Sequence, residues 1–302
     1  MKKSTKWFLI IGGSVFAFFI VMLIIGIVAL FKGGEDYEEV TISGKGGTLA
    51  LIELSEPIVS SENTVRLLKK YRENSSVKGI IFRVETPGGG VAASQEIYEE
   101  VKKTRESGKP VVISMGAVAA SGGYYISCGA SKIVANPGTV TGSIGVITQF
   151  MHFNQLMEKI GVSSTTVKSG KLKDSGSPLR AFNEDDKKYF QEVVNDLYAQ
   201  FVEVVSQERN LPIEKVKQLA DGRVYTGKQA YNVGLVDTLG TYEDAITITA
   251  NLAGISGTPK LIKERKKEKL VDMFVGEAKS GINSLKQEML YEPLVQYMIV
   301  KP

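Results

Sequence analysis

The sequence predicts an α/β protein built on a largely parallel sheet, and two observations lead to this fold class. From Gly47 onward, short runs rich in β-branched residues alternate with longer amphipathic segments, an order that is typical of βαβ units. The short runs are nearly continuous in apolar residues, as expected for strands that helices cover on both faces. A hydrophobic fraction of 43% in 302 residues also suffices for a sizeable core.

A long apolar stretch precedes this α/β region. Residues 7–31 contain no charged side chain, and at about 1.5 Å per helical residue they can cross the roughly 30 Å core of a bilayer. Three lysines lie within residues 1–6, whereas acidic residues soon follow Lys32. By the positive-inside rule, we expect residues 1–6 in the cytoplasm and the rest of the chain outside it, at the cell membrane.

A removable signal peptide is the alternative for this stretch. Its apolar region would be about 7 to 15 residues long and would end at a small-residue cleavage site. Here the stretch is longer and runs into Leu30-Phe31-Lys32. We therefore expect an uncleaved single-pass transmembrane helix at 7–31, followed by a linker at 32–46.

The elements of the α/β region are expected in a regular order. Strands are predicted at 48–54, 78–85, 110–115, 132–135 and 145–149, and helices at 61–73, 91–107 and 183–209. Asn183 begins the last helix and is followed by three acidic residues, which favour a helix start. The mixed-charge run at 263–269 is expected to leave the core, so we assign the catalytic domain to 47–259 and a C-terminal tail to 260–302.

Composition argues against several classes of function. The net charge of +4 is small, and the basic residues form no stripe with interleaved aromatics, so no nucleic-acid partner is expected. The single cysteine, Cys128, cannot form an internal disulfide. No Cys/His cluster has the spacing of metal ligands, so no metal is expected.

The first glycine-rich turn is T-P-G-G-G at 86–90, between an expected strand and an expected helix. Free backbone amides in such a turn can stabilise a developing negative charge. An ordinary strand-to-helix turn is one alternative, and a phosphate-binding loop is another. A phosphate loop of the Walker type would need a Lys-Ser/Thr pair that is absent here.

A second glycine-containing turn carries the candidate nucleophile. Ser121 lies in A-A-S-G-G-Y-Y, after the strand at 110–115 and at the start of an apolar helix. A serine there exposes its hydroxyl at the carboxyl end of the sheet, where the amide of Gly122 and one from the turn at 86–90 can stabilise an oxyanion. The alternative is a serine that only caps the helix.

A nucleophilic serine needs a base, and the chain offers one histidine against many lysines. His152 lies among aromatic residues, where a structural role is more common than a catalytic one. The turn S-G-K-L-K-D at 169–174 is the better candidate. A lysine base must be neutral, so a pKa of about 10.4 has to fall to near 7 at a cost of about 4 kcal/mol, which burial must supply.

At these motifs the chain resembles the bacterial signal peptide peptidase A, or protease IV, family in its short single-repeat form. The resemblance extends from about Gly47 to Asp244. It rests on T-P-G-G-G at 86–90, A-S-G-G-Y-Y at 120–125, T-G-S-I-G-V at 141–146, S-G-x-x-K-D at 169–174 and G-R-V-Y-T-G-K-Q-A at 222–230.

The resemblance implies a catalytic set with named positions. Ser121 matches the family's nucleophile, and Lys173 matches its general-base lysine, because the motif places the base three residues after the glycine. Lys171 is therefore the less favoured lysine. Ser143 matches the accessory serine that hydrogen-bonds the lysine, and Gly89 and Gly122 match the amides of the oxyanion hole.

The resemblance also implies the setting of this site. The core would be of the ClpP/crotonase type, and subunits would form a homo-oligomeric ring in which the lysine of one subunit completes its neighbour's serine site. No metal or organic cofactor would be needed. The substrates would be remnant signal peptides and other extended apolar peptides, cleaved at the extracytoplasmic face of the membrane.

Three other functions remain open at this point. A crotonase-like acyl-CoA enzyme would use the same paired amides without a nucleophile. A non-catalytic membrane scaffold would bind peptides without cutting them, and a related membrane protease would cut one specific membrane protein. A further hypothesis concerns the apolar segment at 291–300, which resembles a substrate and can occupy an active-site groove. The alternative is a helix or strand that faces a partner.

Overall fold

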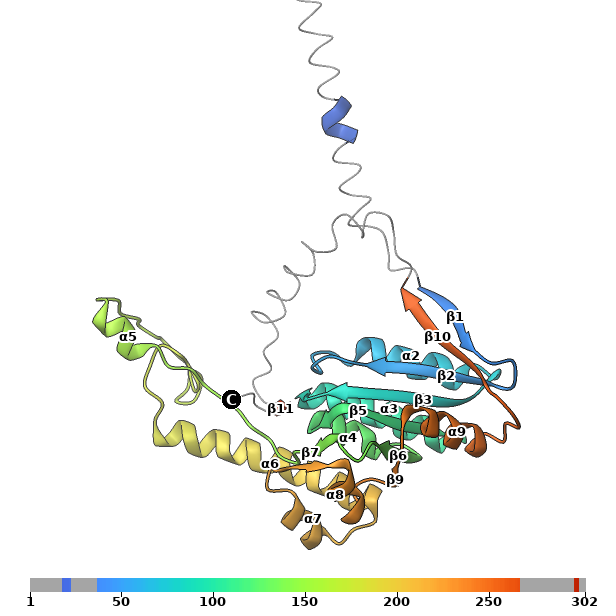
Figure 1. The fold of residues 1–302 in the computed structure, drawn as a ribbon. Coiled ribbons are helices and arrows are strands. Elements are labelled where there is room, and N and C mark those ends of the chain that lie inside the picture. The colour runs from blue at the N-terminus through green and yellow to red at the C-terminus, as the bar shows by residue number, and fades with distance from the viewer. Residues whose placement is uncertain (1–17, 23–36, 267–295, 299–302) are drawn as a thin grey trace, which may run out of the picture. The chain divides into compact units, whose positions relative to one another are not determined.

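The computed structural model describes residues 18–22, 37–266 and 296–298 (Figure 1). The chain divides into two compact units, one of residues 1–39 with 264–288 and the other of residues 40–263 with 289–302. The second unit contains all the predicted site residues.

The predicted membrane anchor at 7–31 lies mostly outside the described residues. Only 18–22 of that stretch are described, and they are helical. Among the described residues, no helix combines the length and the apolar character needed to cross a bilayer.

Strands and helices alternate along most of the second unit, as the sequence predicts. The strands are β1 (Tyr37–Ser43), β2 (Thr48–Leu54), β3 (Val77–Thr86), β4 (Gly88–Gly90), β5 (Val111–Ala120), β6 (Lys132–Ala135), β7 (Val140–Gly142), β8 (Val224–Thr226), β9 (Thr238–Leu239), β10 (Lys260–Lys266) and β11 (Gln296–Met298). The helices are α2 (Glu62–Glu73), α3 (Val91–Glu106), α4 (Gly122–Cys128), α5 (Asn154–Lys159), α6 (Glu184–Arg209), α7 (Ile213–Leu219), α8 (Gly227–Asn232) and α9 (Tyr242–Leu252).

The main sheet has the strand order β1-β10-β2-β3-β5-β6-β9. The pairs from β10 to β9 are parallel, so the α/β prediction with a parallel-rich sheet is confirmed. A side branch leaves the carboxyl end of β5, where β7 pairs with β5 in parallel and β8 pairs with β7 in antiparallel. The candidate site lies at this branch point.

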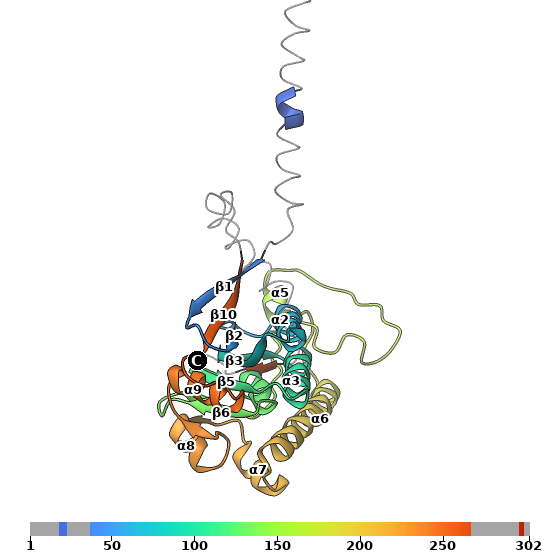
Figure 2. The same cartoon turned by 90° about the vertical axis from the view of Figure 1, so that its right-hand side faces the viewer.

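Helices cover both faces of the sheet, as Figure 2 shows with α9 on one side of the strands and α2 and α3 on the other. Alternate residues of each strand therefore enter different cores. Phe82 belongs to the large core beneath α2, α3 and α4, whereas Ile81 belongs to the smaller core beneath α9. Burial on both faces explains why the strands read as continuous apolar runs.

The helix predicted at 183–209 is confirmed with its cap. The Asn183 side chain accepts a hydrogen bond from the backbone N–H of Asp186, and the Asp186 carboxylate accepts one from the N–H of Asn183. This reciprocal pair satisfies two amides that a helix start leaves without partners.

The strand predicted at 145–149 is wrong, because β7 ends at Gly142 and only Ile147 of the predicted range forms a single β-bridge. Gly142 has φ of 76° and the next residue, Ser143, has φ of 50°. Two successive residues in the left-handed region turn the chain away from the ladder. The apolar run that follows was therefore mistaken for a strand.

The expectation that the charged run leaves the core is also wrong for its first residues. Residues 260–266 form β10, which pairs with β2 in parallel, and both Leu261 and Ile262 are buried. Lys263 forms a 3.1 Å ion pair with Glu53 of the neighbouring strand β2. Residues 267–269 lie outside the described part of the chain.

Candidate active site

Ser121 lies where β5 passes directly into α4. Its backbone has φ of 53° and ψ of −114°, a strained conformation for a residue with a side chain. Such strain costs about 1 to 3 kcal/mol and is concentrated at functional sites. The exposed hydroxyl expected from the sequence is wrong, because the Ser121 side chain is buried within this chain, and its Oγ has no hydrogen-bond partner among the described residues. A buried hydroxyl without a partner indicates that another group binds there.

Neighbouring backbone groups hold Ser121 in this strained conformation. Its N–H donates to the carbonyl of Gly142 at 2.7 Å, and its carbonyl accepts from the N–H of Tyr125 at 2.8 Å. The whole of α4 is buried. Ser121 is therefore fixed from both sides before any ligand arrives.

Two glycines from separate segments meet beside this serine. A methyl group on Gly122 would lie 3.3 Å from the backbone nitrogen of Gly89, so the two glycines are in close contact. Gly122 is also the first residue of α4, where helix amides have no partner within the helix. An oxyanion hole would use these two amides if both face the carbonyl that Ser121 attacks.

Glycine is needed at both positions for reasons of space. A methyl group on Gly89 would lie 2.2 Å from the carbonyl oxygen of Ile58, and one on Gly122 would lie 2.6 Å from Oγ of Ser94. Ile58 also pairs with Gly88–Gly90 through two backbone hydrogen bonds, at 2.8 and 2.7 Å. The glycine-rich turn predicted at 86–90 thus becomes the short strand β4, with Ile58 along one edge.

The other edge of β4 carries the end of the chain. β11 pairs with β4 in antiparallel, with Tyr297 opposite Gly89 and Met298 opposite Gly88. β11 also contacts α4, which begins after Ser121. The edge of β4 therefore accepts an extended segment, as was hypothesised for the apolar tail.

Ser143 lies one residue beyond the end of β7. Ala120 is paired with Gly142 in the β5–β7 ladder, so Ser121 and Ser143 follow directly paired residues. Ser143 is buried, has φ of 50°, and donates its N–H to the carbonyl of Arg223 at 2.9 Å. The structure therefore brings the predicted nucleophile and the predicted accessory serine together.

Lys173 is not part of this cluster within one chain. It lies on the arm, by which we mean residues 150–183 between β7 and α6, and its side chain is exposed. Figure 1 shows α5, within the arm, lying away from the sheet. Because Ser121 Oγ has no described partner, Lys173 does not contact it here.

The turn that bears Lys173 is nevertheless well anchored. The Asp174 carboxylate accepts hydrogen bonds from Lys168 at 2.5 Å and from Arg180, and these bonds lower the pKa of Asp174. Arg180 also pairs with the buried Asp186 at the start of α6. The backbone around Lys173 is thus tied to the base of α6.

The alternative bases have other partners. Lys171 forms an exposed ion pair with Asp185 at 2.7 Å. His152 lies on the arm with its ring 5.4 Å from that of Phe182, away from Ser121. Its aromatic contact fits the structural role that the sequence favoured.

The arm exposes an unusual number of large apolar side chains. Those at least 40% exposed are Met151, Phe153, Leu156, Ile160, Val162, Val167, Leu172 and Leu179. Contiguous exposed apolar residues commonly mark an interaction surface. The arm that carries Lys173 therefore has the character of a contact surface.

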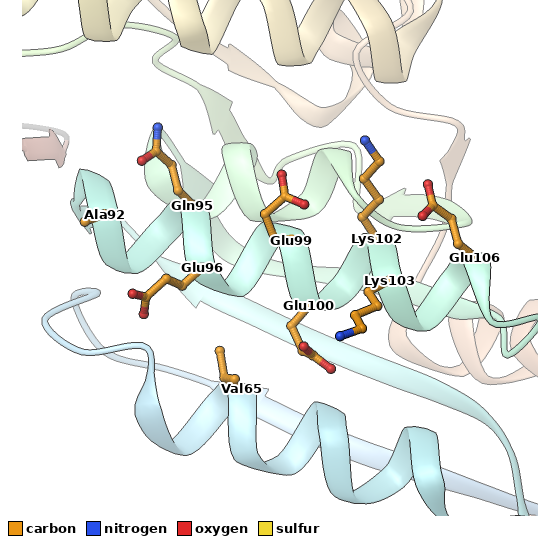
Figure 3. A pocket seen from close by; sticks show the side chains of 9 residues that line it. All are labelled: Val65, Ala92, Gln95, Glu96, Glu99, Glu100, Lys102, Lys103 and Glu106. Atoms are coloured by element: carbon orange, nitrogen blue, oxygen red, sulfur yellow. The ribbon is translucent and has the colours of Figure 1, made fainter.

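A surface groove of about 740 Å³ runs along α3. Figure 3 shows its lining side chains, which include Glu96, Glu99 and Glu100 on both sides of the helix. None of the predicted site residues lines it. Its mixed charges are those of a solvated helix face.

Sequence reasoning missed two residues that shape the site. Gly142 accepts the hydrogen bond from Ser121, and Ser94 fills the space beside Gly122. Gly142 lies within the motif that drew attention to Ser143, which is the signal that could have identified it.

Among the described residues, no cluster of three or more His, Cys, Asp or Glu side chains could hold a metal.

Comparison with known proteins gives consistent matches. The model of Peptidase family S49 matches residues 103–256. The Enterococcus faecium protein named "Putative signal peptide peptidase SppA" is 35% identical over 91% of this chain and 80% of its own length. Protease 4 of Haemophilus influenzae is 39% identical over 66% of this chain and 32% of its own, and the chloroplastic serine protease SPPA of Arabidopsis thaliana is 36% identical over 74% and 33%.

Proposed function

This chain belongs to peptidase family S49 and is a serine peptidase, and from that premise we propose that it cleaves peptides with Ser121 as nucleophile and Lys173 as general base. The observation that carries the proposal is the buried, unpartnered Oγ of Ser121 on a strained backbone beside two convergent glycines. A ClpP/crotonase-type core belongs to the same proposal.

The chemistry follows from these groups. Neutral Lys173 takes the proton of Ser121 as Oγ attacks the scissile carbonyl, and the amides of Gly89 and Gly122 stabilise the resulting oxyanion. The lysine then protonates the leaving amine, and water hydrolyses the acyl-enzyme. The role of Ser143 is to hydrogen-bond the lysine and hold it in place.

The site is completed between subunits. Within one chain Lys173 is exposed, whereas a lysine base must be desolvated to become neutral. Docking of the apolar arm on a second copy would bury Lys173 at that copy's Ser121 and cover the exposed side chains. A homo-oligomeric ring satisfies both requirements, because each subunit gives one arm and receives another.

The substrates are extended apolar peptides, in particular remnant signal peptides. The pairing of β11 with β4 supports binding of a peptide as an added strand, which places its backbone beside Gly89. The relative from E. faecium carries the name of a signal peptide peptidase. The apolar stretch at 7–31 would anchor the chain in the membrane where such peptides remain.

Hydrolysis of a fluorogenic apolar peptide by the full-length protein in mild detergent tests this function. Ser121→Ala and Lys173→Ala should each fall to near background, and their combined loss should be far from additive because the two residues act as one unit. Lys171→Ala and His152→Ala are the matched controls and should keep activity. Activity in Ser121→Ala, or its loss in His152→Ala, would overturn the mechanism.

A further inference from the structure

Tyr225, in the middle of β8, packs directly against the turn formed by Gly142 and Ser143. A methyl group on Gly142 would lie 2.5 Å from Cδ2 of Tyr225, so the ring occupies the space beside the glycine. The ring is buried, and its hydroxyl donates to the carbonyl of Leu219 at 2.9 Å, at the end of α7. This hydrogen bond therefore fixes the Tyr225 ring in its contact with Gly142.

The strand around Tyr225 also holds the backbone of this turn. In the antiparallel β7–β8 pair, Tyr225 lies opposite Thr141 and Val224 lies opposite Gly142. The carbonyl of Arg223 accepts the N–H of Ser143 at 2.9 Å. Residues 223–225 thus contact Gly142 and Ser143 through both backbone and side chain.

One hydrogen bond links this turn to the nucleophile, Ser121. The carbonyl of Gly142 accepts the N–H of Ser121 at 2.7 Å. Gly142 has φ of 76°, a conformation that glycine adopts without strain, so the turn relies on its neighbours, including the Tyr225 ring, to hold it in place. Movement of this peptide would shift both Ser121 and Ser143.

We propose that Tyr225 is a positioning residue for the peptidase reaction, whose ring fixes the Gly142–Ser143 turn and through it the Ser121 nucleophile. This inference rests on the proposed roles of Ser121 and Ser143. It assigns to the motif at 222–230 a function that the resemblance alone does not give. Tyr225 acts through Gly142 and does not itself react.

Two replacements of Tyr225 separate the effect of its ring on kcat from the effect of its hydroxyl. Tyr225→Phe keeps the ring beside Gly142 and loses only the bond to Leu219, so kcat should stay within about threefold of wild type. Tyr225→Leu removes the ring, and kcat should fall by about 10- to 100-fold with KM nearly constant, because small displacements of a nucleophile slow chemistry more than binding.

A second buried tyrosine supplies the stability control. Tyr71 is fully buried in the same core, but its carbonyl is bound by Lys109 near the start of β5, at the opposite end of that strand from Ser121. Tyr71→Leu should lower the thermal midpoint as Tyr225→Leu does, yet keep kcat. Equal kcat losses in the two variants would show that Tyr225 only stabilises the core, and would overturn the proposal.

Gly142→Ala keeps the test decisive if Tyr225→Leu does not fold. The added methyl group would lie 2.5 Å from Cδ2 of the Tyr225 ring, on a residue whose φ of 76° also disfavours a side chain, so the turn must shift and kcat should fall with KM nearly constant. Unchanged kcat in a folded Gly142→Ala protein would overturn the role of the contact. Ser121→Ala is measured in parallel. If Ser121→Ala retains activity, the proposed function itself fails. If Ser121→Ala loses activity but Tyr225→Leu has normal kcat, only the positioning role of Tyr225 is refuted.

Discussion

Gly122 approaches Gly89 so closely that a methyl group on the first would lie 3.3 Å from the backbone nitrogen of the second. Two glycines from separate segments thus lie in close contact next to Ser121. Gly89→Ala and Gly122→Ala keep the backbone N–H but must displace it, because the added methyl group would lie 2.2 Å from the carbonyl oxygen of Ile58 or 2.6 Å from Oγ of Ser94. Each should lower kcat by up to about 10²- to 10³-fold, the range seen when one oxyanion donor no longer acts. Peptide hydrolysis under saturating substrate measures this effect.

The control for these variants is Gly138→Ala. Gly138 lies between β6 and β7, and a methyl group there would meet no atom within 4 Å. Its kcat should equal that of the wild type. Similar losses at Gly138 and Gly89 would contradict a specific role for the paired amides.

Sites shared between subunits predict complementation between two inactive proteins. Ser121→Ala and Lys173→Ala chains, each near background alone, should regain activity when co-expressed. With random mixing, a site has an intact serine and an intact neighbouring lysine in about a quarter of cases, so activity should reach about a quarter of wild type. Background activity in a mixed oligomer would contradict site sharing and place both groups in one chain.

The tail strand predicts that part of the binding groove is occupied in the resting protein. Truncation after Ser280 removes β11, and a tethered occupant acts as a competitor, so the apparent KM for a peptide should fall by roughly two- to tenfold. Tyr297→Pro is the matched variant, because it removes one backbone N–H from β11 without shortening the chain. Unchanged kinetics in both variants, with the oligomer intact, would exclude occupancy of the groove.

Cys128 provides a prediction about pH. The thiol is buried in α4, and burial raises its pKa from 9.0 to about 12. The reactive thiolate is therefore scarce near pH 8, and an aromatic disulfide reagent should modify the native protein hardly at all but the urea-unfolded protein fully. Because the folded pKa is raised, the contribution of this group to stability is present below pH 9 and is lost as pH rises towards 12. Rapid modification of the native protein would contradict this burial.

Many of the strands and helices could be predicted because their apolar patterns and helix-capping residues indicate the same elements. β2 is found at the predicted residues, and α6 begins at its predicted cap, Asn183. β10 was missed because its charged residues suggested solvent, whereas Leu261 and Ile262 alone decide its burial. Pairing between distant segments leaves no trace in local composition.

The site was predictable in its residues but not in its geometry. The motifs identified Ser121, Ser143 and the glycines, and the structure places these together. The strained φ of Ser121 and the packing of Tyr225 on Gly142 depend on contacts between segments that are distant in sequence, since Ser121 bonds Gly142 and Gly142 contacts Tyr225. Sequence cannot reveal such contacts without a fold.

Covalent labelling tests the central claim, that Ser121 is the nucleophile, most directly. The full-length protein is treated with a fluorophosphonate, and the modified residue is identified by peptide mass spectrometry as activity is followed. We expect one adduct, on Ser121, whose formation matches the loss of activity, is absent in Ser121→Ala and is strongly slowed in Lys173→Ala. Inactivation with the adduct on another residue, or full labelling of Ser121 with activity retained, would contradict the assignment.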